Sequence, residues 1–215
     1  YFDAQNEVRV KQKAKAADMY ADVIFNAKQD QMSYLESNTL PFPYFHPDHL
    51  FVRTPEKFND LSCPRIIHAP SSPISKGTPL VRAALKKLKL EGYTFEYIEL
   101  FNVPHTQVLE TLHQAHIVLN EFYAFMPGVF AIEAMANHCA VLTSADPTIE
   151  TDLAAGAGEA WYVTGYWAIY DNLKDLLDHP EKIKAYADNG YDWTFKNYST
   201  GNAKIRLLKQ LHVTA

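Results

Sequence analysis

The sequence predicts an α/β protein built on a doubly wound, mostly parallel sheet of the Rossmann-like kind. Three observations favour this fold class. From about residue 60 onward, short apolar runs alternate with segments of helical periodicity. The apolar runs are almost continuously hydrophobic, as strands are when helices cover both faces of a sheet. The segments between them place leucine and alanine on one helical face. Such alternation is typical of an open sheet whose strands are joined by crossover helices.

The apolar runs give five expected strands, at residues 65–70, 95–100, 116–120, 140–144 and 160–164. The periodic segments give six expected helices, at residues 79–89, 106–115, 128–137, 170–177, 180–189 and 203–211. Ligands of doubly wound sheets bind beyond the carboxyl ends of the strands. We therefore expect the ligand-binding edge of the sheet to consist of the strand-to-helix turns at 70–78, 101–105, 121–128 and 144–150.

The first third of the chain has a different pattern. Residues 1–20 read as a charged helix, 21–25 as a strand and 29–35 as a short helix. Residues 38–64 contain five prolines and are expected to form an extended linker. The chain opens with Tyr1 rather than Met, inside what reads as a polar helix, so we expect a fragment of a longer protein.

Composition narrows the class of protein. With 47% hydrophobic and 21% charged residues, the chain has the composition of a soluble globular protein. A net charge of −5 argues against nucleic acid as a partner. Cys63 and Cys139 lack the spacing of metal ligands and are expected to be reduced, packed thiols. No apolar run approaches the roughly 18 residues of a membrane span, so we expect a cytoplasmic protein.

The segment from Gly128 to Ala136 is the first candidate for ligand binding. A glycine at the start of a helix allows a phosphate to approach backbone N–H groups, and the helix N-terminus favours negative charge there. Glu133, further along the same helix, is placed to reach the hydroxyls of an attached ribose. The alternative is that Glu133 is a solvated helix residue and Gly128 only a turn.

The turn after the first predicted strand is the second candidate. It reads HAPSSPISKGTP from residue 68 to 79 and contains one fixed positive charge, Lys76. A lysine can neutralise a diphosphate as a point charge, while Gly77 and Thr78 supply a backbone approach and an N-cap. The alternative is a solvated lysine beside an ordinary cap. The sequence contains neither GxxxxGK[ST] nor GxGxxG, which argues against a kinase or a dehydrogenase.

Five segments in order carry a family resemblance: "HAPS…KGT", "VPHTQV", "HIVLNEF", "PGVFAIEAMA" and "AVLTS". Together they resemble the carboxyl-terminal, donor-binding domain of GT-B glycosyltransferases of family 4, also called group 1. The resemblance covers roughly residues 60–200. It implies a sugar transferase that uses a UDP- or GDP-linked nucleotide diphosphate sugar as substrate, with no cofactor and no metal.

The resemblance also implies roles for individual residues. Lys76, before Gly77, would contact the donor diphosphate, and Glu133 would bond the ribose. The loop after the second strand, with Asn102, Val103 and Pro104, would flank the base. The turn that would present backbone N–H groups to the phosphates consists of Pro127, Gly128, Val129 and Phe130.

Two positions depart from the family pattern. The common arginine, five residues before the lysine, is replaced by Ser71, which stays among the expected donor-site residues. The first glutamate of the family's pair, eight residues before Glu133, is replaced by Phe125. That acid normally faces the sugar, so its loss leaves the identity of the sugar open. Glu121 can substitute for it, or can serve packing or face solvent.

The resemblance suggests a division into four parts. Residues 1–40 would be a remnant of the amino-terminal acceptor domain, and 41–63 a proline-rich linker. Residues 64–190 would bind the nucleotide-sugar, and 191–215 would cross back to the acceptor domain. The catalytic residues on the acceptor side are then expected outside this chain. We expect the fragment to bind a donor without turning it over.

Three other clusters have alternative interpretations. His46 and His49 lie in the proline-rich segment without a third ligand, so we expect no metal there. Asp146 and Glu150 can contact sugar hydroxyls or cap a helix. A group of aromatic residues can form a sugar-stacking platform, although core packing is the expected role; it consists of Trp161, Tyr162, Tyr166, Trp167 and Tyr170.

The sequence thus predicts the donor-binding part of a retaining glycosyltransferase. Its expected acceptor is a glycan or a lipid-linked glycan in bacterial surface polysaccharide synthesis. Membrane association would be peripheral, through the missing domain at the inner face of the membrane. One alternative is a non-catalytic, Rossmann-like binding or scaffold module, which the changes at Ser71 and Phe125 would suit. Another is a sugar-nucleotide epimerase of the same architecture.

Overall fold

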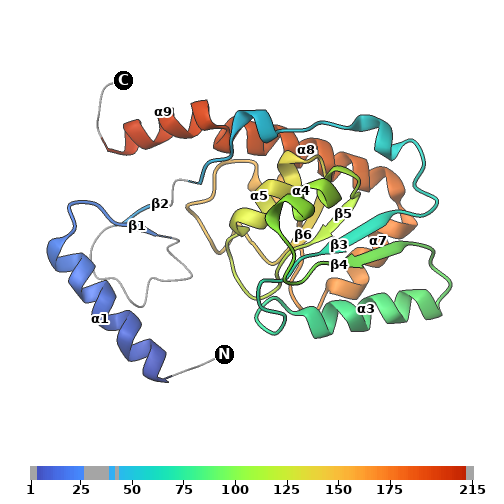
Figure 1. Cartoon of the computed structure of the whole chain (residues 1–215), viewed down its shortest axis with the longest axis horizontal. Helices are drawn as coiled ribbons and strands as arrows, with labels where there is room; N and C mark the ends of the chain where they lie inside the picture. The colour runs from blue at the N-terminus through green and yellow to red at the C-terminus, as the bar shows by residue number, and fades with distance from the viewer. Residues whose placement is uncertain (1–3, 27–38, 42–43, 212–215) are drawn as a thin grey trace.

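The computed structural model describes residues 4–26, 39–41 and 44–211. Within these ranges the main sheet has five strands in the order β4-β3-β5-β6-β7, and all its pairings are parallel. Its strands are β3 (Arg65–His68), β4 (Glu96–Glu99), β5 (Ile117–Leu119), β6 (Ala140–Thr143) and β7 (Tyr162–Val163). The predicted α/β fold class with a parallel, Rossmann-like sheet is therefore confirmed (Figure 1).

The helices around the sheet are α3 (Thr78–Leu90), α4 (His105–His113), α5 (Gly128–Ala136), α6 (Ala157–Ala160), α7 (Ile169–Asp178), α8 (Pro180–Tyr198) and α9 (Thr200–Gln210). Each strand is shorter than predicted, because ladder pairing ends where the chain turns into its loop. The predicted helix end at 189 is wrong. Helix α8 continues to Tyr198 because Trp193 and Tyr198 still pack into the core. The predicted strand at 160–164 is also too long, since Ala160 ends α6.

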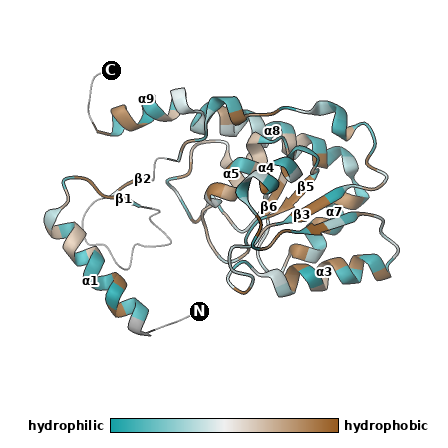
Figure 2. Cartoon of the chain, in the orientation of Figure 1, coloured by the Kyte–Doolittle hydropathy of each residue, from teal (hydrophilic) through white to brown (hydrophobic). Residues whose placement is uncertain are grey.

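The core has two halves, one on each face of the sheet. Neighbouring strand residues point to opposite faces, so Ile66 belongs to one cluster and Ile67 to the other. Helices α3 and α7 cover the first cluster through Leu85 and Leu173. Helices α4 and α5 cover the second, where Leu112 packs. Figure 2 shows the apolar strands enclosed by helices with hydrophilic outer faces.

The amino-terminal part lies apart from the main sheet in Figure 1. It contains α1 (Ala4–Tyr20) and a short parallel pair formed by β1 (Phe25–Asn26) and β2 (Leu40–Pro41). The strand predicted at 21–25 thus begins later, at Phe25, and the helix predicted at 29–35 lies outside the described residues. The four-part division stays a prediction, and its boundary at 190/191 falls inside α8.

The sequence predicts an extended linker in the proline-rich segment, and this prediction is wrong for part of it. It contains two 3-10 turns, η1 (Asp48–Leu50) and η2 (Pro55–Phe58). Pro55 opens η2, where its fixed φ suits the first helical position and its missing N–H costs nothing. The segment is also fastened to the main domain. The His46 N–H donates to the Tyr198 carbonyl at 2.7 Å, and the Val52 N–H donates to the Ala136 carbonyl at 2.8 Å.

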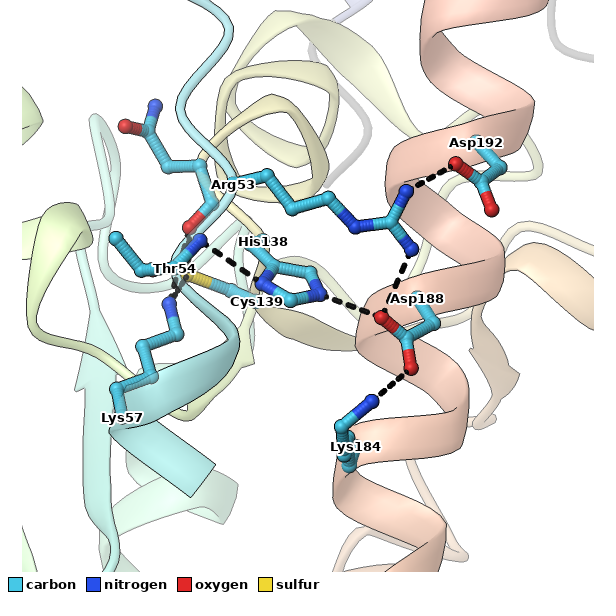
Figure 3. Close-up of polar contacts among 9 residues, drawn as sticks. Arg53, Thr54, Lys57, His138, Cys139, Lys184, Asp188 and Asp192 are labelled. Atoms are coloured by element: carbon cyan, nitrogen blue, oxygen red, sulfur yellow. Dashed lines mark hydrogen bonds and ion pairs between the residues drawn. The ribbon is translucent and has the colours of Figure 1, made fainter. Parts of the chain in front are cut away.

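A buried histidine also connects this segment to the main domain (Figure 3). His138 Nδ1 accepts a hydrogen bond from the Thr54 N–H at 3.1 Å, and its Nε2–H donates to Asp188 on α8 at 2.8 Å. Asp188 also accepts from Arg53 at 3.0 Å and pairs with Lys184. Burial lowers the pKa of His138, so the neutral ring with its proton on Nε2 fits both partners.

The two cysteines differ in exposure. Cys139 is buried, and Lys57 of η2 lies 3.7 Å from its Sγ while donating to the Asn137 carbonyl at 3.0 Å (Figure 3). Burial raises the pKa of the Cys139 thiol, which therefore stays protonated. Cys63 is exposed, so the expectation that both thiols are packed is wrong for this one. It lies in the bend before β3.

Candidate functional site

Two loops leave the main sheet side by side at its carboxyl edge. Residues 69–77 follow β3 and residues 120–127 follow β5, and these strands are neighbours although β4 lies between them in sequence. This is the switch point where doubly wound sheets bind their ligands. A cavity of about 310 Å³ opens there. Its lining consists of Ala69, Ser71, Lys76, His105, Val108, Asn120, Pro127, Gly128, Val129, Phe130 and Glu133.

Buried hydrogen bonds hold both loops in place. The Asn120 amide donates to the Pro127 carbonyl at 2.6 Å and to Thr143 Oγ1 at 3.2 Å, which closes the loop before α5. His68, at the end of β3, donates from Nδ1 to the Leu119 carbonyl at 2.7 Å. Its Nε2 accepts from Thr78 Oγ1 at 2.8 Å, and burial lowers its pKa, so the ring is neutral. The rim of the cavity is therefore rigidly supported.

Glycines at two helix starts have left-handed backbone conformations. Gly128 opens α5 with φ 70°, and Gly77 precedes α3 with φ 77°. Residues with a Cβ rarely adopt these angles. Gly77 also lies under aromatic rings, since a Cβ there would be 3.4 Å from Phe122 and 3.5 Å from Tyr123. Both glycines thus shape the turns as predicted, but Gly77 supports the cavity from outside its lining.

The start of α5 faces the cavity without a capping side chain. Its N-cap residue is Pro127, no side chain bonds the first turn, and that turn contains no acid. Pro127 has no backbone N–H, so the backbone groups that can donate hydrogen bonds to a phosphate here are the N–H groups of the residues that follow it. The helix dipole favours an anion at this end. Val129 is exposed at the rim, whereas Phe130 is half-buried.

Two side-chain pairs set the polar environment of the cavity. Lys76 pairs with Glu121, whose side chain is only 10% exposed. Glu133 is largely buried and accepts a hydrogen bond from His105 Nε2 at 2.8 Å. Thus Lys76 and Glu133, predicted from separate segments, lie in one cavity, and each has a polar side-chain partner.

Some predicted site residues lie elsewhere. The expected base-flanking residues Asn102, Val103 and Pro104 are not in the lining, although the next residue, His105, is. His105 belongs to the base-flanking loop that the resemblance implies, residues 101–105, although it is not among the site residues expected from the sequence. Ala69, Val108 and Asn120 were missed as well, since a small, an apolar and an amide side chain have no pattern of their own.

A histidine from the linker approaches the same region. His46 is buried, and its Nε2 has no hydrogen-bond partner within the described ranges. Burial lowers the pKa of His46, and the hydrogen bond with the Leu50 backbone and the charge of Glu133 oppose part of that shift. Among the residues with described positions, no group of three metal-ligating side chains gathers here or elsewhere.

A second cavity, of about 420 Å³, lies beyond the loop that contains Phe122 and Tyr123. Tyr166 and Trp167 line it and are 50% and 75% exposed, so their expected role in the core is wrong. Trp161, by contrast, is fully buried. The two exposed rings lie in the loop between β7 and α7, and core positions resume at Ile169 in α7.

The acids after β6 have local structural roles. Asp146 caps its own turn by accepting from the Thr148 N–H at 2.8 Å. Glu150 is fully buried and accepts from the Asp152 N–H at 3.3 Å. Asp146 also lines the second cavity, whereas neither acid lines the first.

Comparison with known proteins identifies the fold. No protein-family model and no curated protein matches the sequence. Among solved structures, sucrose-phosphate synthase from Thermosynechococcus elongatus superposes with a TM-score of 0.68 at 16% identity, over 99% of this chain and 63% of that one. Anabaena Alr3699/HepE in complex with UDP-glucose gives 0.67 at 12% identity, over 96% and 68%. WaaG, a glycosyltransferase involved in lipopolysaccharide biosynthesis, gives 0.57 at 14% identity, over 87% and 61%.

The chain has the fold of GT-B glycosyltransferases. The resemblance inferred from the sequence is thereby confirmed at the level of the fold. This GT-B chain spans about two thirds of the length of those proteins. Within the described part of the GT-B chain, no helix is long and apolar enough to cross a bilayer.

Proposed function

We propose that this chain is the donor-binding part of a glycosyltransferase and holds a UDP- or GDP-linked sugar in the cavity between β3 and β5. One observation carries the proposal. Lys76, the uncapped start of α5 and Glu133 line a single cavity at the switch point of the sheet. The cation and the backbone N–H groups suit a diphosphate, and the carboxylate can accept hydrogen bonds from the hydroxyls of its ribose.

Each group has a distinct task in this mechanism. The ammonium of Lys76 and the N-terminus of α5 stabilise the negative charge that develops on the departing diphosphate. Glu133 accepts hydrogen bonds from the ribose hydroxyls at the acceptor positions of its carboxylate that His105, bonded to Oε1, does not use. Because the helix dipole and Lys76 supply positive charge, we propose a transfer that uses no metal ion and no cofactor.

The acceptor, the stereochemistry and the location of the reaction are properties of the whole protein. The acceptor would be a glycan or lipid-linked glycan, as in the lipopolysaccharide biosynthesis named for WaaG, and the anomeric configuration would be retained. Acceptor-positioning residues would belong to a domain outside this chain. We propose that the chain alone binds donor without transfer, on the cytoplasmic side, and that any membrane contact is made through that other domain.

Thermal unfolding with added nucleotide tests the proposal. A ligand that binds only the folded state at about 100 times its Kd stabilises it by about 2.7 kcal/mol. We expect UDP or GDP to raise the Tm of the wild-type chain and to leave that of Glu133→Ala unchanged. Glu110→Ala, on the exposed side of α4, is the matched control and should respond as the wild type does. A Tm that no nucleoside diphosphate changes would favour a scaffold module instead.

A further inference from the structure

The carboxylate of Glu121 lies at the border of the proposed donor site, against two residues that line it, Lys76 and Gly128. One of its oxygens pairs with Lys76. The other, Oε1, would be 3.6 Å from a Cβ built on Gly128, the first residue of α5. The carboxylate therefore lies between the ammonium group and the start of the helix.

These are the two positively polarised groups that the proposed function assigns to the donor's diphosphate. A carboxylate is an anion and satisfies the same groups. We propose that Glu121 is an internal anion that holds Lys76 at the diphosphate position until the diphosphate of a donor displaces it. This inference rests on the proposed function and adds a selection for charge at the same site.

The local structure allows an exchange by side-chain rotation alone. The Glu121 carbonyl accepts from the Ser144 N–H at 2.9 Å and from Thr143 Oγ1 at 3.2 Å, so its backbone is fixed to β6. The Lys76 N–H is likewise bonded to the Ser72 carbonyl at 3.0 Å. The lysine side chain is 29% exposed, and both side chains are long enough to turn toward solvent.

The charge balance of the cavity makes the exchange selective. The cavity and its border hold one lysine, Lys76, and two carboxylates, Glu121 and Glu133. A ligand with little charge cannot replace Glu121 on the lysine. A diphosphate can replace Glu121 on the lysine, but the negative charge of Glu121 repels it at close range, where Coulomb energies are large. Loss of the Glu121 charge should therefore favour diphosphates in particular.

Calorimetric titration of UDP, UMP and uridine into the wild-type chain and Glu121→Gln tests this, with GDP, GMP and guanosine as the parallel series. Glutamine keeps the shape of the side chain and removes its charge. We expect Glu121→Gln to bind the nucleoside diphosphate roughly tenfold more tightly, with a smaller gain for the monophosphate and none for the nucleoside. Glu110→Gln removes the same charge from the outer side of α4 and should bind as the wild type does.

A second variant pair keeps the inference falsifiable. In Lys76→Met, the addition of Glu121→Gln should no longer give the full gain, because the ammonium for which the two anions compete is gone. If the wild type binds UDP or GDP but Glu121→Gln binds no tighter, the internal anion is refuted and the donor site stands. If neither chain binds a nucleoside diphosphate, both proposals fail.

Discussion

Replacement of Asp188 by asparagine should destabilise the chain by about 2 kcal/mol at neutral pH. Asp188 on α8 accepts hydrogen bonds from Arg53 and His138 and pairs with Lys184 (Figure 3). Burial alone would raise its pKa, but the hydrogen bonds of Lys184, His138 and Arg53 outweigh it and lower the pKa to about 2. The charged form is thus stabilised only in the folded chain.

The magnitude follows from that pKa. A fall from 3.8 to about 2 corresponds to about 2.5 kcal/mol of stability once the pH is well above the unfolded value. Because the folded pKa is the lower one, this stability is present at neutral pH and is lost as the pH falls through about 4 toward 2. About half of it should remain near pH 3. In a chain of this length, a loss of about 2 kcal/mol lowers the Tm by roughly 4–8 °C.

Urea unfolding of the wild type and Asp188→Asn from pH 7 down to pH 3 measures the difference. Asp192→Asn is the matched control, since Asp192 also pairs with Arg53 but its side chain is 64% exposed. An exposed pair contributes at most about 1 kcal/mol, so this control should stay close to the wild type. Equal stabilities of wild type and Asp188→Asn at pH 7, or a difference that does not shrink on acidification, would refute the reasoning.

Two further substitutions test the packing around the sheet. Gly190→Ala should lower the free energy of unfolding by roughly 1–3 kcal/mol through overpacking, because the new Cβ would be 2.7 Å from a backbone oxygen of α6. Gly201→Ala, whose Cβ would have no atom within 4 Å, should be neutral or stabilising. Equal chemical-denaturation midpoints for the two variants would contradict this. Thr78→Val should lower the free energy of unfolding by roughly 1–3 kcal/mol, since it leaves Nε2 of buried His68 without its hydrogen-bond donor. Thr106→Val, at an exposed position, should change the denaturation midpoint little. Similar losses in both variants would contradict the role assigned to Thr78.

The order of strands and helices could be predicted because it depends on local patterns. Apolar runs and helical faces are encoded within a few residues, and the switch-point rule then places the loops after β3 and β5 together. This is why Lys76 and Glu133, 57 positions apart in the sequence, could be assigned to one site from the sequence and a family resemblance. Element ends were less accurate, as with α8, because tertiary packing of Trp193 decides them.

Contacts between distant side chains could not be predicted. The pairing of Lys76 with Glu121 and that of Glu133 with His105 depend on loop geometry that no local pattern encodes. His138 gave no signal either. Its φ of 59° is unusual for a residue with a side chain, and its role depends on Thr54 and α8, far away in sequence. The exposure of Tyr166 and Trp167 was mispredicted because aromatic content alone does not distinguish core from rim.

The backbone amides at the start of α5 provide the most direct test of the donor site. Two-dimensional ¹H–¹⁵N NMR of the labelled chain, titrated with UDP and with GDP, reports on each N–H group separately. We predict that the largest shifts fall on Val129, Phe130 and Ala131, with a smaller change at Gly77, and that Lys76→Ala weakens the response. Shifts confined to Gly165–Trp167 at the second cavity, or no shifts with either nucleotide, would contradict the account.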